Sequence, residues 1–207
     1  MAYRLYGRRQ TGVMAIEAAL AEAGLPFDLI EAPRPRTPEE IAAFAVINPR
    51  LQVPVLIHPD GTVITEGPAI LVHIADANPA AGLAPAPGTS ARARHDRWLA
   101  FFQANVYEGM LRELFPDRYT TAPQGKAGVQ QAATAYVRRH FQLFEAELAT
   151  GPYLAGEAFS VFDIYLWMLC YWIDADWLSA NCPRIARLQA TANARPALNA
   201  AGKRHFG

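Results

Sequence analysis

One stretch constrains the fold of this chain more than any other: Gln52 to Asp76, QVPVLIHPDGTVITEGPAILVHIAD. Two short apolar runs, Val55–Ile57 and Thr62–Ile64, flank a segment in which Pro59 and Gly61 favour a turn. A helix is expected to begin at Gly67-Pro68, because Pro suits the first helical position. It is expected to end before Asn78-Pro79, because the residue before a Pro avoids the α region. The stretch therefore predicts a strand hairpin followed by a helix.

Two positions in this stretch have a chemical as well as a structural interpretation. Val53-Pro54 stands where the first strand of the hairpin begins. A cis bond there would leave the Val53 backbone N–H and C=O facing outward, although only about 5–6% of X–Pro bonds are cis. Thr65-Glu66-Gly67 precedes a helix N-terminus, whose free N–H groups attract a carboxylate, and Glu66 suits an ammonium group. A ligand with a free amino-acid end fits both. The alternative is a plain N-terminal turn in which Glu66 favours the helix dipole.

The segments before this stretch alternate between strand and helix patterns. They are a strand at Tyr3–Tyr6, a helix at Val13–Ala23, a strand at Phe27–Ile30 and a short helix from Pro38 to about Phe44. A strand–helix–strand unit normally has parallel strands and a right-handed crossover. The first part of the chain is therefore predicted to follow the order β-α-β-α-β-β-α.

The composition changes near residue 78. Residues 78–89 are rich in Ala, Pro and Gly, as linkers are, and the rest of the chain has helical periodicity. We predict an α/β domain over residues 1–78, a linker over 79–88 and an all-helical domain over 89–207. Ser160-Val161-Phe162-Asp163 resembles a capping box, with Asp in place of the usual Glu or Gln, at the start of an apolar helix.

Bulk composition excludes several classes of function. The 207 residues are 52% hydrophobic and 18% charged with a net charge of zero, so no nucleic-acid or anionic-membrane partner is expected. Two Cys residues are too few for a disulfide framework and suit a reducing compartment. The N-terminus has no apolar region typical of a secretory signal, and no run approaches the roughly 20 apolar residues of a membrane span. The expected location is cytoplasmic.

The central stretch consists of the motif VPVL, a hairpin, and the segment TE-G-x-A-I that opens a helix. This combination resembles the glutathione-binding half of a glutathione transferase. The likeness extends over nearly the whole chain and is closest to bacterial members of the cytosolic superfamily. It implies a thioredoxin-like first domain, then a helical bundle domain that contributes the acceptor-substrate pocket. It also implies a cis Val53-Pro54 bond and a homodimer, in which the first domain of one subunit packs against the second domain of the other.

The resemblance assigns the catalytic role to Thr11. The bacterial pattern Leu-Tyr-Gly-x-x-x-Ser-Gly is matched by the segment from Leu5 to Gly12, with Thr11 in place of Ser. A hydroxyl that donates to the glutathione sulfur favours thiolate over thiol, and Arg8 and Arg9 add positive potential. The alternative is that Thr11 only caps the helix that follows.

The resemblance also implies the glutathione contacts. Gln52 would bond the glycine carboxylate, Val53-Pro54 would line the site, and Glu66 would contact the γ-glutamyl end. Gly67 departs from the usual Ser, so its backbone N–H can bind a carboxylate but the side-chain hydroxyl is absent.

The acceptor pocket is expected to involve Phe102, Tyr107 and Arg112, although the aromatic side chains at helical spacing mostly predict core. The five His residues show no metal-ligand spacing, and neither Cys170 nor Cys182 lies near Thr11 in the sequence. No metal and no cysteine-based chemistry is therefore expected.

The predicted function is conjugation of the thiolate of glutathione, the co-substrate, to small hydrophobic electrophiles. Two alternatives use the same motifs. One is a non-catalytic binding or scaffold protein of the same fold, since fold does not fix function. The other is a glutathione-dependent isomerase or dehalogenase.

Overall fold

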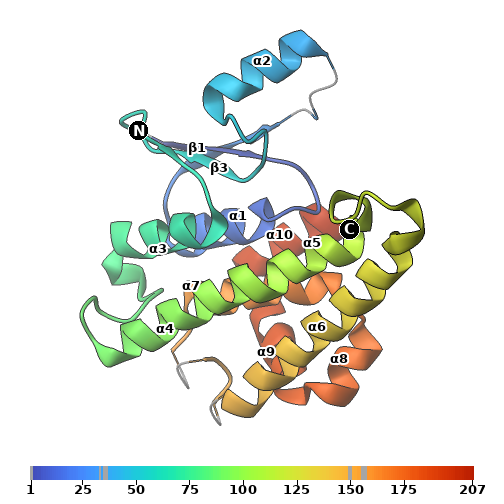
Figure 1. The fold of residues 1–207 in the computed structure, drawn as a ribbon. Helices are drawn as coiled ribbons and strands as arrows, with labels where there is room; N and C mark the ends of the chain where they lie inside the picture. Colours follow the sequence, from blue (N-terminus) through green and yellow to red (C-terminus); the bar gives the residue numbers. More distant parts are fainter. Residues whose placement is uncertain (1, 33, 35–36, 149–150, 155–157) are drawn as a thin grey trace. The chain divides into compact units, whose positions relative to one another are not determined.

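The structure is a computed structural model that describes residues 2–32, 34, 37–148, 151–154 and 158–207 (Figure 1). Its residues form two compact units, one of 1–84 with 192–207 and one of 85–191. The C-terminal residues belong to the first unit, in which the last helix, α10, packs against α1. The predicted boundaries of the α/β domain (1–78), the linker (79–88) and the helical domain (89–207) stay a prediction.

The first unit contains the strands and helices of a thioredoxin-like fold, in the predicted order. They are β1 Tyr3–Gly7, α1 Val13–Glu22, β2 Phe27–Glu31, α2 Pro38–Ile47, β3 Val55–Ile57, β4 Val63–Ile64 and α3 Gly67–Ala77, with α10 Pro196–Phe206 added at the C-terminal end. The predicted thioredoxin-like fold class is confirmed.

The sheet has the strand order β2-β1-β3-β4. β1 and β2 are parallel, with Leu5 beside Leu29, whereas β3 is antiparallel to both β1 and β4. α1 and α3 lie on one side of the sheet and α2 lies on the other (Figure 1). All residues of α1 from Val13 to Leu20 are buried, which explains why its sequence has so few polar positions.

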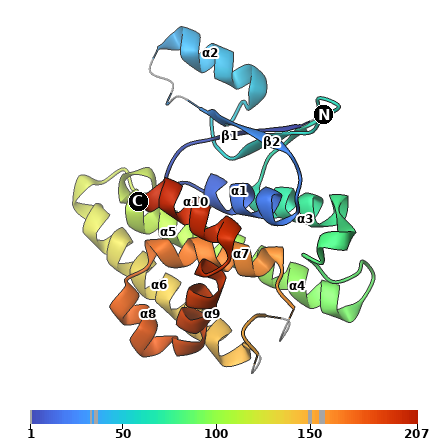
Figure 2. The same cartoon turned by 180° about the vertical axis from the view of Figure 1, so that it is seen from behind.

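α10 lies beside α1, away from α2 (Figure 2). Ion pairs join the two segments: Arg195 pairs with Glu22, and Arg204 pairs with Glu17 at 2.8 Å. Glu17 is only 5% exposed, so this contact lies in the interior of the unit. These ion pairs therefore join α1 to both ends of the α10 segment.

The second unit is helical. Its longer elements are α4 Ser90–Phe101, the π-helical turn η2 Phe102–Tyr107, α5 Glu108–Leu114, α6 Lys126–Glu147, α7 Val161–Leu169, α8 Ala175–Asn181 and α9 Pro183–Asn193. Aromatic rings form its core, with Phe102 in edge-to-face contact with Phe141, Phe144 and Phe162. In the described part of the chain, no helix combines the length and apolar character needed to span a membrane.

The capping box predicted at the start of α7 is confirmed. The Ser160 hydroxyl and backbone N–H both donate to Asp163 Oδ2, at 2.6 and 2.8 Å, and the Leu154 N–H donates to Oδ1 at 2.9 Å. Asp163 is fully buried, and this burial raises its pKa to about 6 against the opposing effect of the hydrogen bonds to its carboxylate.

Candidate functional site

Three loops of the first unit meet at one end of the sheet. β1 and β3 are antiparallel, with Tyr6 opposite Val55, so residues 8–12 after β1 lie next to residues 52–54 before β3. β3 and β4 are also antiparallel, with Leu56 opposite Ile64, so Thr65 and Glu66 emerge at the same end. The topology therefore brings together every residue predicted for glutathione binding and thiol activation in this unit.

These loops also contain the backbone strain of the described chain. Among the residues that the structure describes, the non-glycine residues with positive φ are Gln10, Leu51 and Glu66, at 57°, 57° and 67°. Each lies in a different one of the three loops. Such conformations cost on the order of 1–3 kcal/mol each and cluster at functional sites. The coincidence supports the placement of the site here.

Gly7 allows the loop before α1 to turn tightly. A Cβ built at Gly7 would lie 2.2 Å from a Val13 methyl carbon, well inside van der Waals contact. The glycine of the Leu5-Tyr6-Gly7 motif is therefore required for the close approach of β1 and the α1 N-terminus.

Thr11 lies half-buried in this loop, and its hydroxyl donates to the Arg8 carbonyl oxygen at 2.7 Å. The alternative role as helix cap is not seen, since the N-cap of α1 is Gly12 and no side chain caps it. Among the residues that the structure describes, the first N–H groups of α1 therefore have no side-chain acceptor, and the positive end of the helix dipole faces the loop region.

Arg8 contributes an unsatisfied donor to the same loop. Its Nε is buried without a hydrogen-bond partner among the described residues. Burial lowers the pKa of the Arg8 guanidinium, and the nearby charge of Arg34 lowers it further. A partly desolvated guanidinium with a free N–H is stabilised by an anion, so Arg8 fits a negatively charged ligand group.

The loop between α2 and β3 is built around Asn48, which is 5% exposed. Its Nδ2 donates to the Gln52 carbonyl oxygen at 2.9 Å, and its Oδ1 accepts from the Arg50 N–H at 3.0 Å. The Val53-Pro54 bond is cis, as predicted. Gln52 is exposed, whereas Val53 packs partly against the small apolar cluster beneath α2.

Glu66 and Gly67 stand at the start of α3. Glu66 is the N-cap residue, but its side chain makes no capping hydrogen bond. Its carboxylate pairs instead with the Arg50 guanidinium, and both side chains are about half exposed. Pro68 occupies the first turn and has no N–H of its own, and in the described part of the chain no side chain caps the other N–H groups of that turn.

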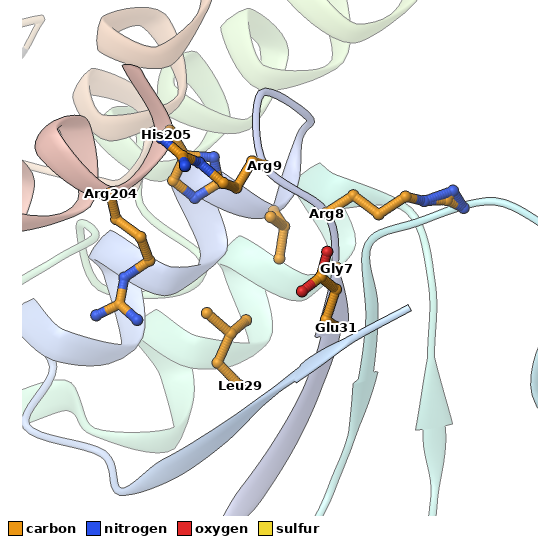
Figure 3. A pocket seen from close by; sticks show the side chains of 8 residues that line it. Gly7, Arg8, Arg9, Leu29, Glu31, Arg204 and His205 are labelled. Carbon is orange, nitrogen blue, oxygen red and sulfur yellow. The ribbon is translucent and has the colours of Figure 1, made fainter. Parts of the chain in front are cut away.

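A pocket of about 250 Å³ opens beside the β1–α1 loop (Figure 3). It is lined by Gly7, Arg8, Arg9, Val13, Leu29, Glu31, Arg204 and His205. In Figure 3 the Arg8 side chain points away from α10, whereas Arg9 extends toward it. None of the predicted glutathione-binding residues lines this pocket, which belongs to the interface of β2, α1 and α10.

The residues predicted for the acceptor pocket lie in the helical unit. Phe102 is fully buried in the aromatic core. Tyr107 is half-buried, stacked on Tyr165 and edge-on to Trp172. Arg112 pairs with Glu108 at 3.7 Å and lies over the Tyr119 and Tyr136 rings.

Phe102 and Tyr107 are the two ends of the π-helical turn η2. π-Helical turns occur frequently at functional sites, and helical periodicity alone did not predict this one.

Both cysteines are buried and unlike activated thiols. Burial, with a contribution from Glu145, raises the pKa of Cys182 to about 12, and burial also raises the pKa of Cys170. In the described segments, no cluster of three or more His, Cys, Asp or Glu side chains is placed to hold a metal ion.

Sequence reasoning missed three residues around the site: Asn48, Arg50 and His205. Asn48 and Arg50 organise the α2–β3 loop, and His205 Nδ1 accepts from the Gln10 N–H at 3.0 Å. Nothing in the sequence linked Arg50 to Glu66 or His205 to Gln10.

Comparison with known proteins gives a consistent result over both units. Family models for the glutathione S-transferase N-terminal and C-terminal domains match residues 14–77 and 127–200. A glutathione S-transferase of Xanthomonas campestris is 29% identical, over 96% of this chain and 98% of its own.

Solved structures extend the comparison. The glutathione S-transferase of a sphingomonad, complexed with glutathione, is 32% identical over 98% of both chains with a TM-score of 0.80. A glutathione transferase homologue from Sulfitobacter with bound glutathione has a TM-score of 0.87 at 26% identity, again over 98% of both chains.

Proposed function

Because the chain belongs to the glutathione S-transferase family and is a transferase of that kind, we propose that it binds glutathione where the three loops meet and conjugates the thiolate to small hydrophobic electrophiles. The observation that carries the proposal is the convergence of loops 8–12, 48–54 and 65–66 with the N-termini of α1 and α3. Two helix N-termini and an exposed carboxylate at one edge fit a tripeptide with two carboxylates and one ammonium group.

The γ-glutamyl end of glutathione is assigned to the start of α3. The Glu66 carboxylate would hold the ammonium group, and the Gly67 N–H with the first turn of α3 would hold the carboxylate. Arg50 now occupies the Glu66 carboxylate, so it would have to share it or move aside. Gln52 would bond the glycine carboxylate, and the Val53 backbone would align the peptide.

Thiolate stabilisation is assigned to the β1–α1 loop. Thr11 is the first candidate, and its hydroxyl would have to turn from the Arg8 carbonyl oxygen toward the sulfur. The Gly12 N–H at the α1 N-terminus and the unsatisfied Arg8 Nε are alternative donors. All three act by stabilising negative charge on the sulfur, and catalysis would otherwise be positioning.

The electrophile is assigned to the helical unit, near Tyr107 and Arg112. Their rings and guanidinium offer an apolar surface with one positive charge. Phe102, being fully buried, would act there only through the residues that pack on it. The active form is proposed to be a homodimer located in the cytoplasm, and a monomer mass in solution at micromolar concentration would contradict the dimer.

A non-catalytic glutathione-binding protein is the second candidate. Two observations favour it: the Thr11 hydroxyl is already engaged by Arg8, and Gly67 lacks the hydroxyl that the family usually has. Retention on immobilised glutathione, followed by turnover with a broad panel of aryl and alkyl halides, epoxides and enones, separates the two. Retention without turnover on any substrate would favour the binding protein.

Thr11→Val tests the role of the hydroxyl directly. The substitution keeps the shape and removes the donor, so the thiol pKa of bound glutathione should rise and turnover near neutral pH should fall, while affinity changes little. Thiolate absorbance as a function of pH measures the pKa. If pKa and turnover are unchanged, the donor is the Gly12 N–H or Arg8.

A further inference from the structure

We propose that His205, near the end of α10, is a positioning residue that holds the β1–α1 loop in the conformation required for thiol activation. The inference rests on the proposed function for its kinetic consequences. Its structural part rests on contacts within the first unit alone.

The central contact joins residues that are 195 positions apart. The Gln10 backbone N–H donates to His205 Nδ1 at 3.0 Å, and His205 is 1% exposed. Gln10 is the loop residue with φ of 57°, and Thr11 follows it directly. A non-glycine residue keeps such a conformation only when its surroundings determine it, and the imidazole acceptor supplies that determination.

The direction of this hydrogen bond fixes the tautomer of His205. Because Nδ1 accepts, the ring proton is on Nε2, which lies 3.3 Å from Glu17 Oε2. Glu17 Oε1 accepts from Arg204 Nε at 2.8 Å. The Glu17 carboxylate on α1 therefore orients the ring, and the ring orients the loop, in the same way that a carboxylate orients a histidine in other sites.

A second contact ties the loop to α10. Arg9 Nη2 donates to the Gly207 carbonyl oxygen at 3.0 Å. Within the loop, the Thr11 hydroxyl closes back on the Arg8 carbonyl oxygen. The loop is thus internally closed and attached to the C-terminal segment at Arg9 and at Gln10, so a loss of the His205 acceptor should change the position of Thr11 and the Gly12 N–H together.

A matched pair of substitutions tests this role. Counted along the side chain, the Asn Oδ1 stands at the level of His Nδ1, and the Gln amide nitrogen stands at the level of His Nε2. His205→Asn therefore keeps an acceptor for Gln10 and loses the link to Glu17. His205→Gln keeps a donor to Glu17 and loses the acceptor. Both variants lose the ring, so both lose similar packing.

The expected kinetic result is a split between the two variants. His205→Gln should lower kcat on the order of tenfold to hundredfold, as misplacement of a catalytic group by about 1 Å does, with the KM for glutathione changed by less than about twofold. His205→Asn should recover most of the lost kcat. Equal loss in both variants, or no loss in either, would overturn the proposal.

Amide hydrogen exchange of the glutathione-free protein gives a readout that does not depend on turnover. The Gln10 amide should be protected in the wild type and in His205→Asn, and should exchange at least tenfold faster in His205→Gln. A Gln10 amide that exchanges equally in all three proteins would refute the positioning role. If protection splits as expected but no protein binds or turns over glutathione, the proposed function fails and the positioning of the loop stands.

Discussion

Replacement of Ser160 by Ala tests whether the capping box of α7 stabilises the helical unit. The substitution removes one donor to the buried Asp163 carboxylate, the hydroxyl at 2.6 Å. A hydrogen bond to a charged group contributes about 1.5–3 kcal/mol, and a lost N-cap costs about 0.5–2 kcal/mol. We expect a loss of about 2 kcal/mol, which lowers Tm by roughly 4–8 °C in a protein of this size.

The loss should depend on pH, with a sign that follows from the Asp163 pKa. Burial raises this pKa from 3.8 to about 6, so the folded state binds the proton more tightly than the unfolded chain does. The carboxyl therefore contributes most to stability below about pH 4, and that contribution is lost as the pH rises to about 6. Ser160→Ala removes a donor to the ionised form, so its cost should be larger at pH 8 than at pH 5.

Thermal unfolding followed by circular dichroism at pH 5 and pH 8 measures both effects. Ser179→Ala is the matched control, because Ser179 is exposed within α8, where Ala is slightly the better helix former. An unchanged Tm for Ser160→Ala at pH 8 would refute the stabilising role assigned to the hydroxyl, and an equal loss at both pH values would refute the argument that the hydroxyl stabilises the ionised carboxylate.

Two further substitutions examine the loop between α2 and β3. Asn48→Ala removes the buried amide that joins the Gln52 carbonyl oxygen to the Arg50 N–H. The substitution should cost about 1–3 kcal/mol of stability and should raise the KM for glutathione more than it lowers kcat. A variant with wild-type KM would contradict this expectation. Arg50→Ala breaks an exposed ion pair with Glu66 and should change stability by less than about 1 kcal/mol, while calorimetry should detect a change in glutathione affinity if Glu66 binds the ligand ammonium.

The elements of the first unit could be predicted because their signals are local. Pro68 at the first turn and Asn78-Pro79 at the end define α3, and short apolar runs on either side of a turn define β3 and β4. α2 continues to Ile47, beyond the predicted Phe44, because the next stop signal is Asn48-Pro49. The local signals thus limit each element to within a few residues.

The connections that complete the site could not be predicted because they join residues distant in sequence. The Arg50–Glu66 pair crosses 16 residues and the Gln10–His205 hydrogen bond crosses 195. Such contacts depend on strand pairing and on the packing of α10, neither of which has a sequence signature. The π-helical turn at Phe102 had none either, since its apolar spacing is close to that of an ordinary helix.

Calorimetric titration of glutathione into the wild type and Glu66→Gln tests whether the ligand binds at the start of α3. The substitution removes the charge that faces the ligand ammonium, and a hydrogen bond to a charged partner contributes about 1.5–3 kcal/mol, so affinity should fall roughly tenfold or more. The exposed Glu147 in α6 offers a matched control, because Glu147→Gln makes the same chemical change far from these loops in the sequence. We expect glutathione to bind weakly to Glu66→Gln and with wild-type affinity to Glu147→Gln. Wild-type affinity in Glu66→Gln would show that the glutathione site lies elsewhere.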